Sequence, residues 1–403
     1  MIGPAMSNTR PAPLPREIWV LVSAAFVIAM GYGLVAPVLP QFARSFDVGV
    51  TAASVVVSVF AFFRLVFAPV GGKLIGRLGE RPVYLTGLLV VAGSTAATAF
   101  AQNYAQLLIF RGLGGIGSTM FTVSAMGLIV RLAPPTARGR ASSAYGTAFL
   151  LGNIGGPLVG GLLGEAGLRV PFLVYAASLL VAVAVVAVFL RPSALRRPAG
   201  TAQLPVMRLG DALAHPAYRA ALVSAFAHGW SNFGVRVAIL PLFAAAAVGA
   251  GPWAAGAALA AFAIGNALAL TPAGRASDSR GRKPLLVTGL LLNGVLTAAL
   301  ALTGDLVPML VVSALAGVGA GMLNPAQQAT VADVVGSERT AGPVFATFQM
   351  FSDAGQILGP VLAGLLVDHA GYGAAFALSG AITVIAALVW TRAPETLVAH
   401  KAR

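Results

Sequence analysis

Long apolar runs follow one another along almost the entire chain, with short polar turns between them. A helix of about 20 residues crosses the ~30 Å hydrocarbon core of a bilayer, and each run is about that long. Only 9% of the 403 residues are charged, whereas soluble domains carry roughly 25%. We therefore predict an all-α membrane protein with twelve transmembrane helices. The runs lie at residues 18–39, 51–71, 83–101, 105–130, 142–164, 170–190, 218–245, 252–272, 284–303, 306–332, 343–367 and 372–391.

The twelve runs divide six and six about a stretch rich in proline and arginine. Gly115-x-Gly117 in the first half is matched by Gly317-x-Gly319 in the second, as expected of a duplicated six-helix unit. Alternating access needs two such bodies, because they rock about a central site. The predicted organisation is a cytoplasmic tail at 1–17, a six-helix bundle at 18–190, a cytoplasmic linker at 191–217, a second bundle at 218–392 and a cytoplasmic tail at 393–403.

Small residues recur every four positions in the fifth and eleventh runs, and a Gly-Pro step interrupts each series. On a helix, such residues form one smooth stripe along which a neighbouring backbone packs closely. The proline removes a backbone N–H and bends the helix. We expect these helices to slide or rock against a neighbour where the two halves meet. The stripes consist of Gly152, Gly156 and Gly160 with Pro157, and of Gly355 and Gly359 with Pro360.

The net charge of +14 follows membrane topology rather than a nucleic-acid partner. Most lysines and arginines fall in alternate polar segments, which the positive-inside rule assigns to the cytoplasm together with both termini. The Pro-rich residues 1–17 carry no cleavage pattern of a signal peptide, so we expect the first apolar run to direct insertion. The chain has no cysteine, which excludes disulfides and thiolate metal sites. The predicted location is the cell membrane, crossed many times.

Several polar segments resemble motifs of the major facilitator superfamily. Gly72-Lys-Leu-Ile-Gly-Arg77-Leu-Gly79-Glu-Arg81 and its repeat at 274–283 are similar to that family's signature loop. Leu107-x-x-x-Arg111-x-x-Gly-Gly-x-Gly is similar to its fourth-span motif, and residues 152–161 to the fifth-span motif of drug:proton antiporters. The resemblance covers nearly the whole chain. The loop residues that carry it are Gly72, Arg77, Gly79 and Arg81, and Asp278, Gly281, Arg282 and Lys283.

The first signature loop departs from the family pattern. Gly76 stands at the position of the family's aspartate, and Glu80 replaces a basic residue, whereas the second loop has Asp278. The resemblance implies that this aspartate helps hold the cytoplasmic side closed by a charge–dipole contact at a partner helix end. We therefore expect the second loop to contribute more than the first to holding the cytoplasmic side closed.

Charged residues inside the apolar runs are costly and are therefore functional candidates. Arg111 occupies the motif arginine, so the resemblance implies a role in proton coupling or in positioning the central site; its alternative is a structural arginine bonded to helix carbonyls. Asp353 is the only acid well within a predicted span, and it is either the protonated group of the cycle or a permanently paired structural residue.

Arg64 and Asp353 lie at similar depths in spans two and eleven, which face each other in the family. We hypothesise an ion pair between the two halves that closes one side and opens as the halves rock. Arg236 in span seven is a competing partner for Asp353.

Aromatic and amide residues occur in the spans that line the cavity in this family. Such groups bind varied amphipathic molecules by stacking and a few hydrogen bonds, and their alternative role is ordinary interhelical packing. Because Arg111 and Arg236 are present without an acid in the first-half spans, neutral, zwitterionic or weakly acidic solutes are favoured over strong cations. These cavity candidates are Tyr32, Met120, His228, Trp230, Asn232, Phe233, Asn324, Gln327 and Gln328.

The sequence thus predicts a monomeric secondary transporter that exports small amphipathic compounds such as antibiotics. A proton gradient would drive it, with no cofactor and no metal. A proton-coupled importer of nutrients or metabolites with the same fold is the alternative. A membrane enzyme, a receptor or an ATP-driven pump finds no support, because the chain lacks HExxH, GxSxG and phosphate-binding Walker motifs and has no large soluble domain.

Overall fold

A computed structural model describes residues 14–133, 137–190, 207–249, 251–336 and 342–397. Most of the two predicted tails and of the linker at 191–217 lie outside these residues. The described part is almost wholly helical, and no strand occurs within it.

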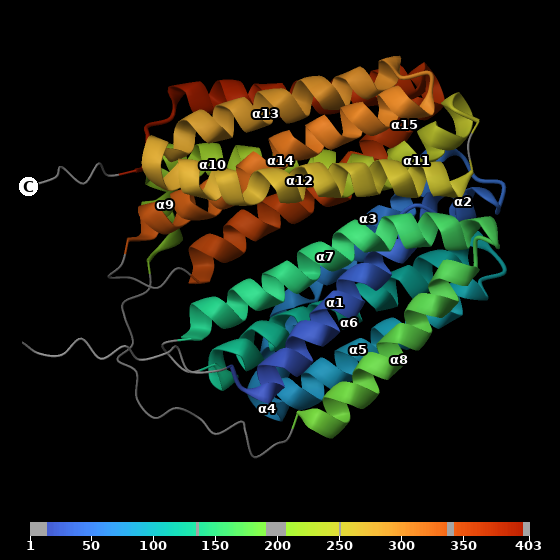
Figure 1. Ribbon diagram of the computed structural model, residues 1–403, viewed down its shortest axis with the longest axis horizontal. Coiled ribbons are helices and arrows are strands. Elements are labelled where there is room, and N and C mark those ends of the chain that lie inside the picture. Colours follow the sequence, from blue (N-terminus) through green and yellow to red (C-terminus); the bar gives the residue numbers. More distant parts are fainter. Residues whose placement is uncertain (1–13, 134–136, 191–206, 250, 337–341, 398–403) are drawn as a thin grey trace, which may run out of the picture.

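The helices before residue 190 form one bundle (Figure 1). Helices α3 and α4 meet at an angle of 47° and together make one bent span. The bend falls just before Pro69, in the first turn of α4, where proline's missing N–H interrupts the hydrogen-bond ladder. The elements are α1 Arg16–Val35, α2 Leu39–Arg44, α3 Val50–Val66, α4 Ala68–Leu78, α5 Glu80–Ala99, α6 Tyr104–Leu132, α7 Arg138–Glu165 and α8 Val170–Phe189.

The helices from residue 207 onward form a second bundle, whose seventh span changes from α-helix to π-helix and back. Its last element, α15, has 51 residues and contains a non-helical break at Gly371 with φ 79°. The elements are α9 Leu209–Ala214, α10 Pro216–His228, η3 Gly229–Val235, α11 Arg236–Ala247, α12 Pro252–Arg280, α13 Arg282–Ala299, η4 Leu300–Leu302, α14 Leu306–Val335 and α15 Gly342–Arg392.

The number of spans agrees with the sequence prediction. Ten described helices are long and apolar enough to cross a membrane, and the bent α3–α4 pair makes eleven. A continuous helix of the length of α15 would measure ~76 Å, more than twice the hydrocarbon thickness. The break at Gly371 divides α15 into two spans, which gives twelve in the described part of the chain.

Two helix pairs form the main interface between the bundles, α7 with α12 and α3 with α15. In Figure 1 the ribbons of the two bundles lie closest at the end that carries α2 and α11, and they spread apart toward α4 and α9. We call these ends the α2 end and the α4 end. Helix α2 also contacts α11 across the interface, where Gln41 donates to the Pro241 carbonyl at 3.3 Å.

The predicted glycine stripes lie on helices that reach the interface, but the stripes themselves face inward. Gly152 and Gly156 pack against the backbone of α1 around Met30, and Gly355 packs against Trp230 and its neighbours. Each stripe therefore joins helices of one bundle, and the expectation that the stripes form the sliding surface between the halves was wrong.

The glycines that do face the other bundle lie beside the stripes. Gly161 packs against Trp253 of α12, and Gly364 packs against Thr51 of α3. One residue turns a helix by about 100°, so Gly161 points away from the direction of Gly160. Helical periodicity identified the smooth stripe, but it did not say which neighbour the stripe would meet.

Candidate functional site

Asp353 of α15 pairs with Arg64 of α3 across the interface, as the sequence hypothesis expected. The Arg64 Nη2 lies 2.5 Å from Asp353 Oδ1 and 2.9 Å from the side-chain oxygen of Gln356. Gln349, one turn before Asp353, donates to the same carboxylate oxygen at 3.0 Å. Asp353 is 6% exposed, so its charge depends on these partners rather than on water. The ion pair is thus a link between the bundles whose acid is buried and whose arginine is partly exposed.

Neighbouring helices hold Arg64 in place. Its backbone carbonyl accepts a 2.6 Å hydrogen bond from the Thr119 hydroxyl of α6. Gly115, one turn earlier on α6, lies against the same stretch of α3 and leaves no room for a side chain. The arginine is therefore positioned by the first bundle and the aspartate by the second.

Arg236 does not compete for Asp353. It is 2% exposed inside the second bundle, donates to the Thr297 hydroxyl at 3.3 Å and lies over the Phe262 ring at 4.0 Å. Its Nε and Nη1 have no hydrogen-bond partner in the described structure. The alternative pairing of Arg236 with Asp353 was wrong, because the two side chains belong to different contacts.

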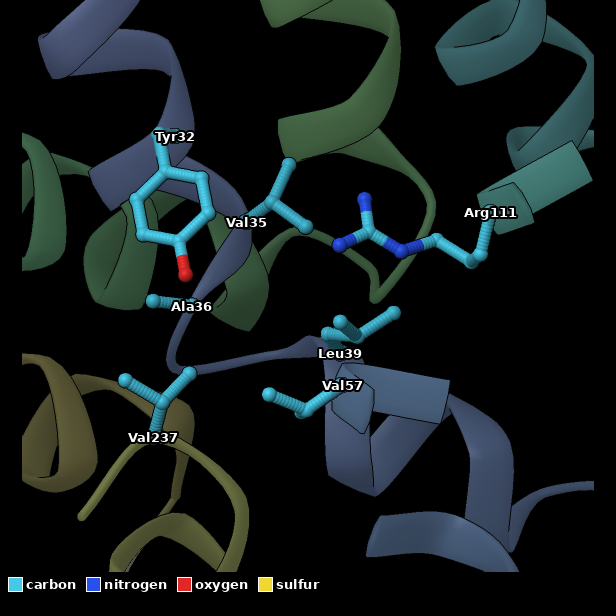
Figure 2. Close-up of a pocket in the computed structure, with 7 residues that line it drawn as sticks. All are labelled: Tyr32, Val35, Ala36, Leu39, Val57, Arg111 and Val237. Atoms are coloured by element: carbon cyan, nitrogen blue, oxygen red, sulfur yellow. The ribbon is translucent and has the colours of Figure 1, made fainter. Parts of the chain in front are cut away.

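Arg111 reaches from α6 into a small pocket that both bundles line (Figure 2). Its guanidinium carbon lies 4.6 Å from the Phe60 ring centroid, and the Tyr32 ring of α1 stands across the pocket. Val237 of α11 closes the side that belongs to the second bundle. The pocket measures about 10 Å³, close to the space one water molecule needs.

No carbonyl or carboxylate accepts a hydrogen bond from the Arg111 guanidinium in the described residues, and its buried Nε is unpartnered. The alternative of an arginine bonded to helix carbonyls thus has no support in this structure. A buried cation held by an aromatic face is available to a polar group that enters the pocket.

Four of the nine cavity candidates belong to a polar network inside the second bundle. His228 contacts the Asn232 amide at 3.1 Å, and Asn232 accepts from Asn293 at 3.1 Å. Trp230 Nε1 donates to the Ser379 hydroxyl at 3.1 Å, and Gln327 donates to Ser224 at 3.0 Å. The His228 contact lies within the seventh span, whereas the other three bonds each join two helices of that bundle, which is the packing alternative.

The remaining candidates are dispersed. Met120 lies against Gly87 of α5, Asn324 is half-buried, and Phe233 and Gln328 are exposed. Only Tyr32 among the nine lines the Arg111 pocket.

Some features of the site left no trace in the sequence analysis. A π-helix over Gly229–Val235 contains Asn232 and Phe233, and such segments are frequent at functional sites. Phe60, Gln356 and Gln349 are the other partners that sequence reasoning missed. Only Gln349 and Gln356 could have been identified from the sequence. They lie about one turn before and one turn after Asp353 on the same helix, where side chains are neighbours.

The two signature loops have the same geometry. Gly79 and Gly281 each end a helix with positive φ, 86° and 109°, which glycine adopts without strain. Arg81 then donates to the Leu190 carbonyl at the end of α8 at 2.6 Å, and Lys283 donates to the Thr391 carbonyl near the end of α15 at 2.8 Å. Each loop thus fastens two helices of its own bundle.

The departure at Glu80 has a structural explanation. Glu80 accepts from the Arg131 Nε at 2.9 Å, while its repeat counterpart Arg282 donates to Asp333 at 3.2 Å. The same helix pair is joined in both bundles, but the charges are exchanged.

Among the described residues, the signature aspartate pairs within its own bundle. The Asp278 side chain is 76% exposed and pairs with Arg282 of its own bundle at 3.0 Å. In the first loop, Gly72 and Arg77 are exposed. The larger contribution of the second loop to closing the cytoplasmic side therefore stays a prediction.

Glu395 adds an acid that caps the second signature loop. Its carboxylate accepts from the backbone N–H groups of Arg282 at 2.8 Å and Lys283 at 3.0 Å, at the N-terminus of α13. Partial burial raises the pKa of Glu395, but hydrogen bonds from four backbone N–H groups outweigh this and lower the pKa below its ordinary value.

The proline of each small-residue stripe makes an equivalent contact. Pro157 lies against Gly33 of α1, and Pro360 lies against Gly234 of η3. The two bundles thus share their helix contacts as well as their sequence motifs.

Comparisons with known proteins agree with this duplicated architecture. The family model described as Major Facilitator Superfamily matches residues 21–235 and 221–402. The quinolone resistance protein NorA of Staphylococcus aureus is 31% identical over 159 residues, which span 39% of this chain and 40% of that protein. Multidrug resistance protein 1 of Bacillus subtilis is 26% identical over 359 residues, 87% of this chain and 89% of that protein.

Solved structures show the same fold. A bacterial homolog of the human lysosomal transporter Spinster, in an inward-facing and occupied conformation, has a TM-score of 0.76 at 18% identity and covers 93% of this chain and 95% of that one. Its inward-facing, unoccupied form has a TM-score of 0.74 at 17% identity, with coverage of 94% and 96%. With family matches along both bundles and twelve spans around a shared interface, this multi-pass membrane protein belongs to the Major Facilitator Superfamily.

Proposed function

We propose that the protein exports small amphipathic compounds across the cell membrane by alternating access, coupled to proton entry. The observation that carries this proposal is the Arg64–Asp353 pair, because it joins the two bundles and contains a buried acid. The names of two similar proteins, a quinolone resistance protein and a multidrug resistance protein, support export of antibiotic-like compounds.

The coupling follows from the contacts of Asp353. In this conformation the carboxylate accepts hydrogen bonds from Arg64 and from the Gln349 amide, and Arg64 also donates to Gln356. When the bundles rock apart along α3 and α15, the acid loses its counter-charge within an apolar surrounding, which favours proton uptake. Return of the bundles would restore the pair and release the proton. Arg64 and Asp353 would thus alternate between an ion pair and a protonated acid with a free arginine.

The Arg111 pocket is the proposed start of the substrate site. Residues of both bundles line it, so rocking changes its size. Arg111 offers a cation and Tyr32 an aromatic face, which suits neutral, zwitterionic or weakly acidic amphipathic compounds. The pocket is too small for such a compound in this conformation, and a further movement of the bundles would have to enlarge it before a substrate binds.

The α4 end is assigned to the cytoplasm. The polar segments that connect the helices there carry most of the lysines and arginines, including both signature loops. Both termini then lie in the cytoplasm. The protein is proposed to act as a monomer in the lipid bilayer, with the proton gradient as driving force and no bound cofactor.

Transport by the purified protein in proteoliposomes tests the proposal. A pH gradient is imposed, and a panel of neutral, zwitterionic and cationic antibiotics is followed together with internal pH. Drug movement opposite to proton flow is expected, and its absence in Asp353→Asn vesicles would tie it to this acid. Movement of a nutrient or metabolite with the protons would instead establish the importer, and no proton flux with any compound would refute coupling.

A further inference from the structure

The two bundles are fastened at the α2 end by carboxylates that cap helices of the opposite bundle. Asp368, near the end of the first part of α15, accepts from the backbone N–H groups of Val50 at 3.0 Å and Thr51 at 2.9 Å. The Thr51 hydroxyl donates to the same carboxylate at 2.6 Å. Glu165, the last residue of α7, accepts from the Trp253 N–H at 3.2 Å.

These two contacts are related by the internal repeat. Asp368 belongs to the second bundle and caps α3 of the first, whereas Glu165 belongs to the first bundle and caps α12 of the second. The contacts therefore cross the interface in opposite directions. A single rocking motion that opens the α2 end must break both.

Each capped helix lacks a cap of its own. The residues that precede α3 and α12 are glycines, Gly49 and Gly251, both with extended backbone and no side-chain cap. The first N–H groups of a helix need acceptors, and a carboxylate at this position also interacts favourably with the helix dipole. A side chain on either glycine would meet the incoming carboxylate. The N-termini of α3 and α12 are thus capped by carboxylates of the opposite bundle.

We propose that Glu165 and Asp368 form a two-point clasp that stabilises the closed state of the α2 end and must release during each transport cycle. The role of the clasp in the cycle rests on the proposed function. Its effect on closure does not, since closure is a property of the protein without substrate.

Distances between spin labels at the α2 end test the clasp in the full-length protein in lipid nanodiscs. Phe100 and Leu302 are 65% and 87% exposed, and they lie in equivalent turns of the two bundles. Cysteines at these positions would be the only ones, because the natural chain has none. Pulsed electron paramagnetic resonance then measures the distance between the two labels and gives the share of molecules with a widened α2 end.

Loss of one helix cap changes an equilibrium by about fivefold. Asp368→Asn is expected to raise the share of the long-distance state about that much. Glu165→Gln is expected to raise it less, because the Asp368 carboxylate accepts three hydrogen bonds and the Glu165 carboxylate accepts one. The double variant should exceed either. Asp305→Asn is the matched control, because Asp305 precedes α14 at the same end and caps nothing with its side chain.

Thr51→Val removes only the hydroxyl donor and is expected to give a roughly twofold rise. This milder variant keeps the test decisive should a charge-neutralised protein misfold. Distance distributions of the double variant and Thr51→Val that match wild type and Asp305→Asn would overturn the clasp. If the distances respond but no drug–proton exchange is found, the clasp holds and the proposed function fails.

Discussion

The two bundles make the same contacts with different residues. Between the signature loop and the fourth helix of each bundle, the first uses Glu80 with Arg131 and the second uses Arg282 with Asp333. The charges are exchanged, yet the helices and the geometry are equivalent. The two bundles thus share an ion pair at the same position in the fold. Exchanging the acid and the arginine between the two helices preserves that ion pair.

At the centre of the molecule the two halves carry different residues. Arg111 in the first bundle faces a pocket lined by both bundles, whereas its repeat counterpart Ser313 is fully buried inside the second. Asp353, the acid that pairs with Arg64, belongs to the second bundle. The signature-loop contacts are therefore equivalent in the two bundles, whereas the residues of the candidate site are not. This pattern is expected of a transporter in which two similar bodies rock about a central site.

The largest effect is expected from breaking the Arg64–Asp353 ion pair between the bundles. Asp353→Asn should lower proton-coupled transport by about 100-fold, because it removes the acid proposed to exchange the proton. The measurement is the initial rate in proteoliposomes. Asp47→Asn at the α2 end is a matched control and should transport normally. Combining Arg64→Asp with Asp353→Arg should regain much of the rate lost by either reversal, and a double variant as inactive as the singles would refute the pairing.

The exchanged ion pairs predict the next largest effect. Glu80→Arg alone places two cations together in a mostly buried position and should destabilise the first bundle by about 3 kcal/mol. Adding Arg131→Asp reproduces the arrangement of the second bundle and should restore most of that loss. Thermal unfolding in detergent measures both. A double variant no more stable than Glu80→Arg would show that the bundles are not equivalent at this contact.

The glycine stripes predict a smaller difference between the bundles. Gly156→Ala should cost about 1–3 kcal/mol, because the added methyl group overlaps the α1 backbone around Met30. Gly359→Ala should cost less, since its nearest backbone atom, the Trp230 oxygen, lies 2.9 Å from the added carbon. Gly155→Ala, where the nearest atom is 3.7 Å away, is the control. Equal melting temperatures for all three variants would contradict the inward-facing stripes.

The smallest effect concerns the cap on the second signature loop. Because the pKa of Glu395 is lower in the folded protein, its contribution to stability is present above its ordinary pKa of 4.5 and is lost as pH falls through the folded value. Since Glu395 is exposed, Glu395→Gln should lower the melting temperature at pH 7 by only about 1–2 °C. This difference should shrink as the pH falls below 4.5, and a difference that stays constant on acidification would rule out the carboxylate as its cause.

Much of the fold could be predicted from the sequence because the bilayer restricts it strongly. Apolar length sets the spans, and the repeat about the 191–217 stretch sets two bundles. The site could be predicted in part. Arg64 and Asp353 were identified because charges in apolar runs are rare, whereas cavity residues such as His228 and Trp230 were not separable from packing residues, since both have polar groups inside helices.

The sequence by itself determined the all-helical class, the twelve spans, the duplication and the charged residues that demand partners. Only the tertiary structure decided which partners they have. Arg64 and Asp353 are separated by 289 residues and Thr51 and Asp368 by 317, and no local pattern encodes contacts of that range. Helical periodicity assigns a residue to a face of its helix, but the neighbour on that face depends on how all twelve helices pack together.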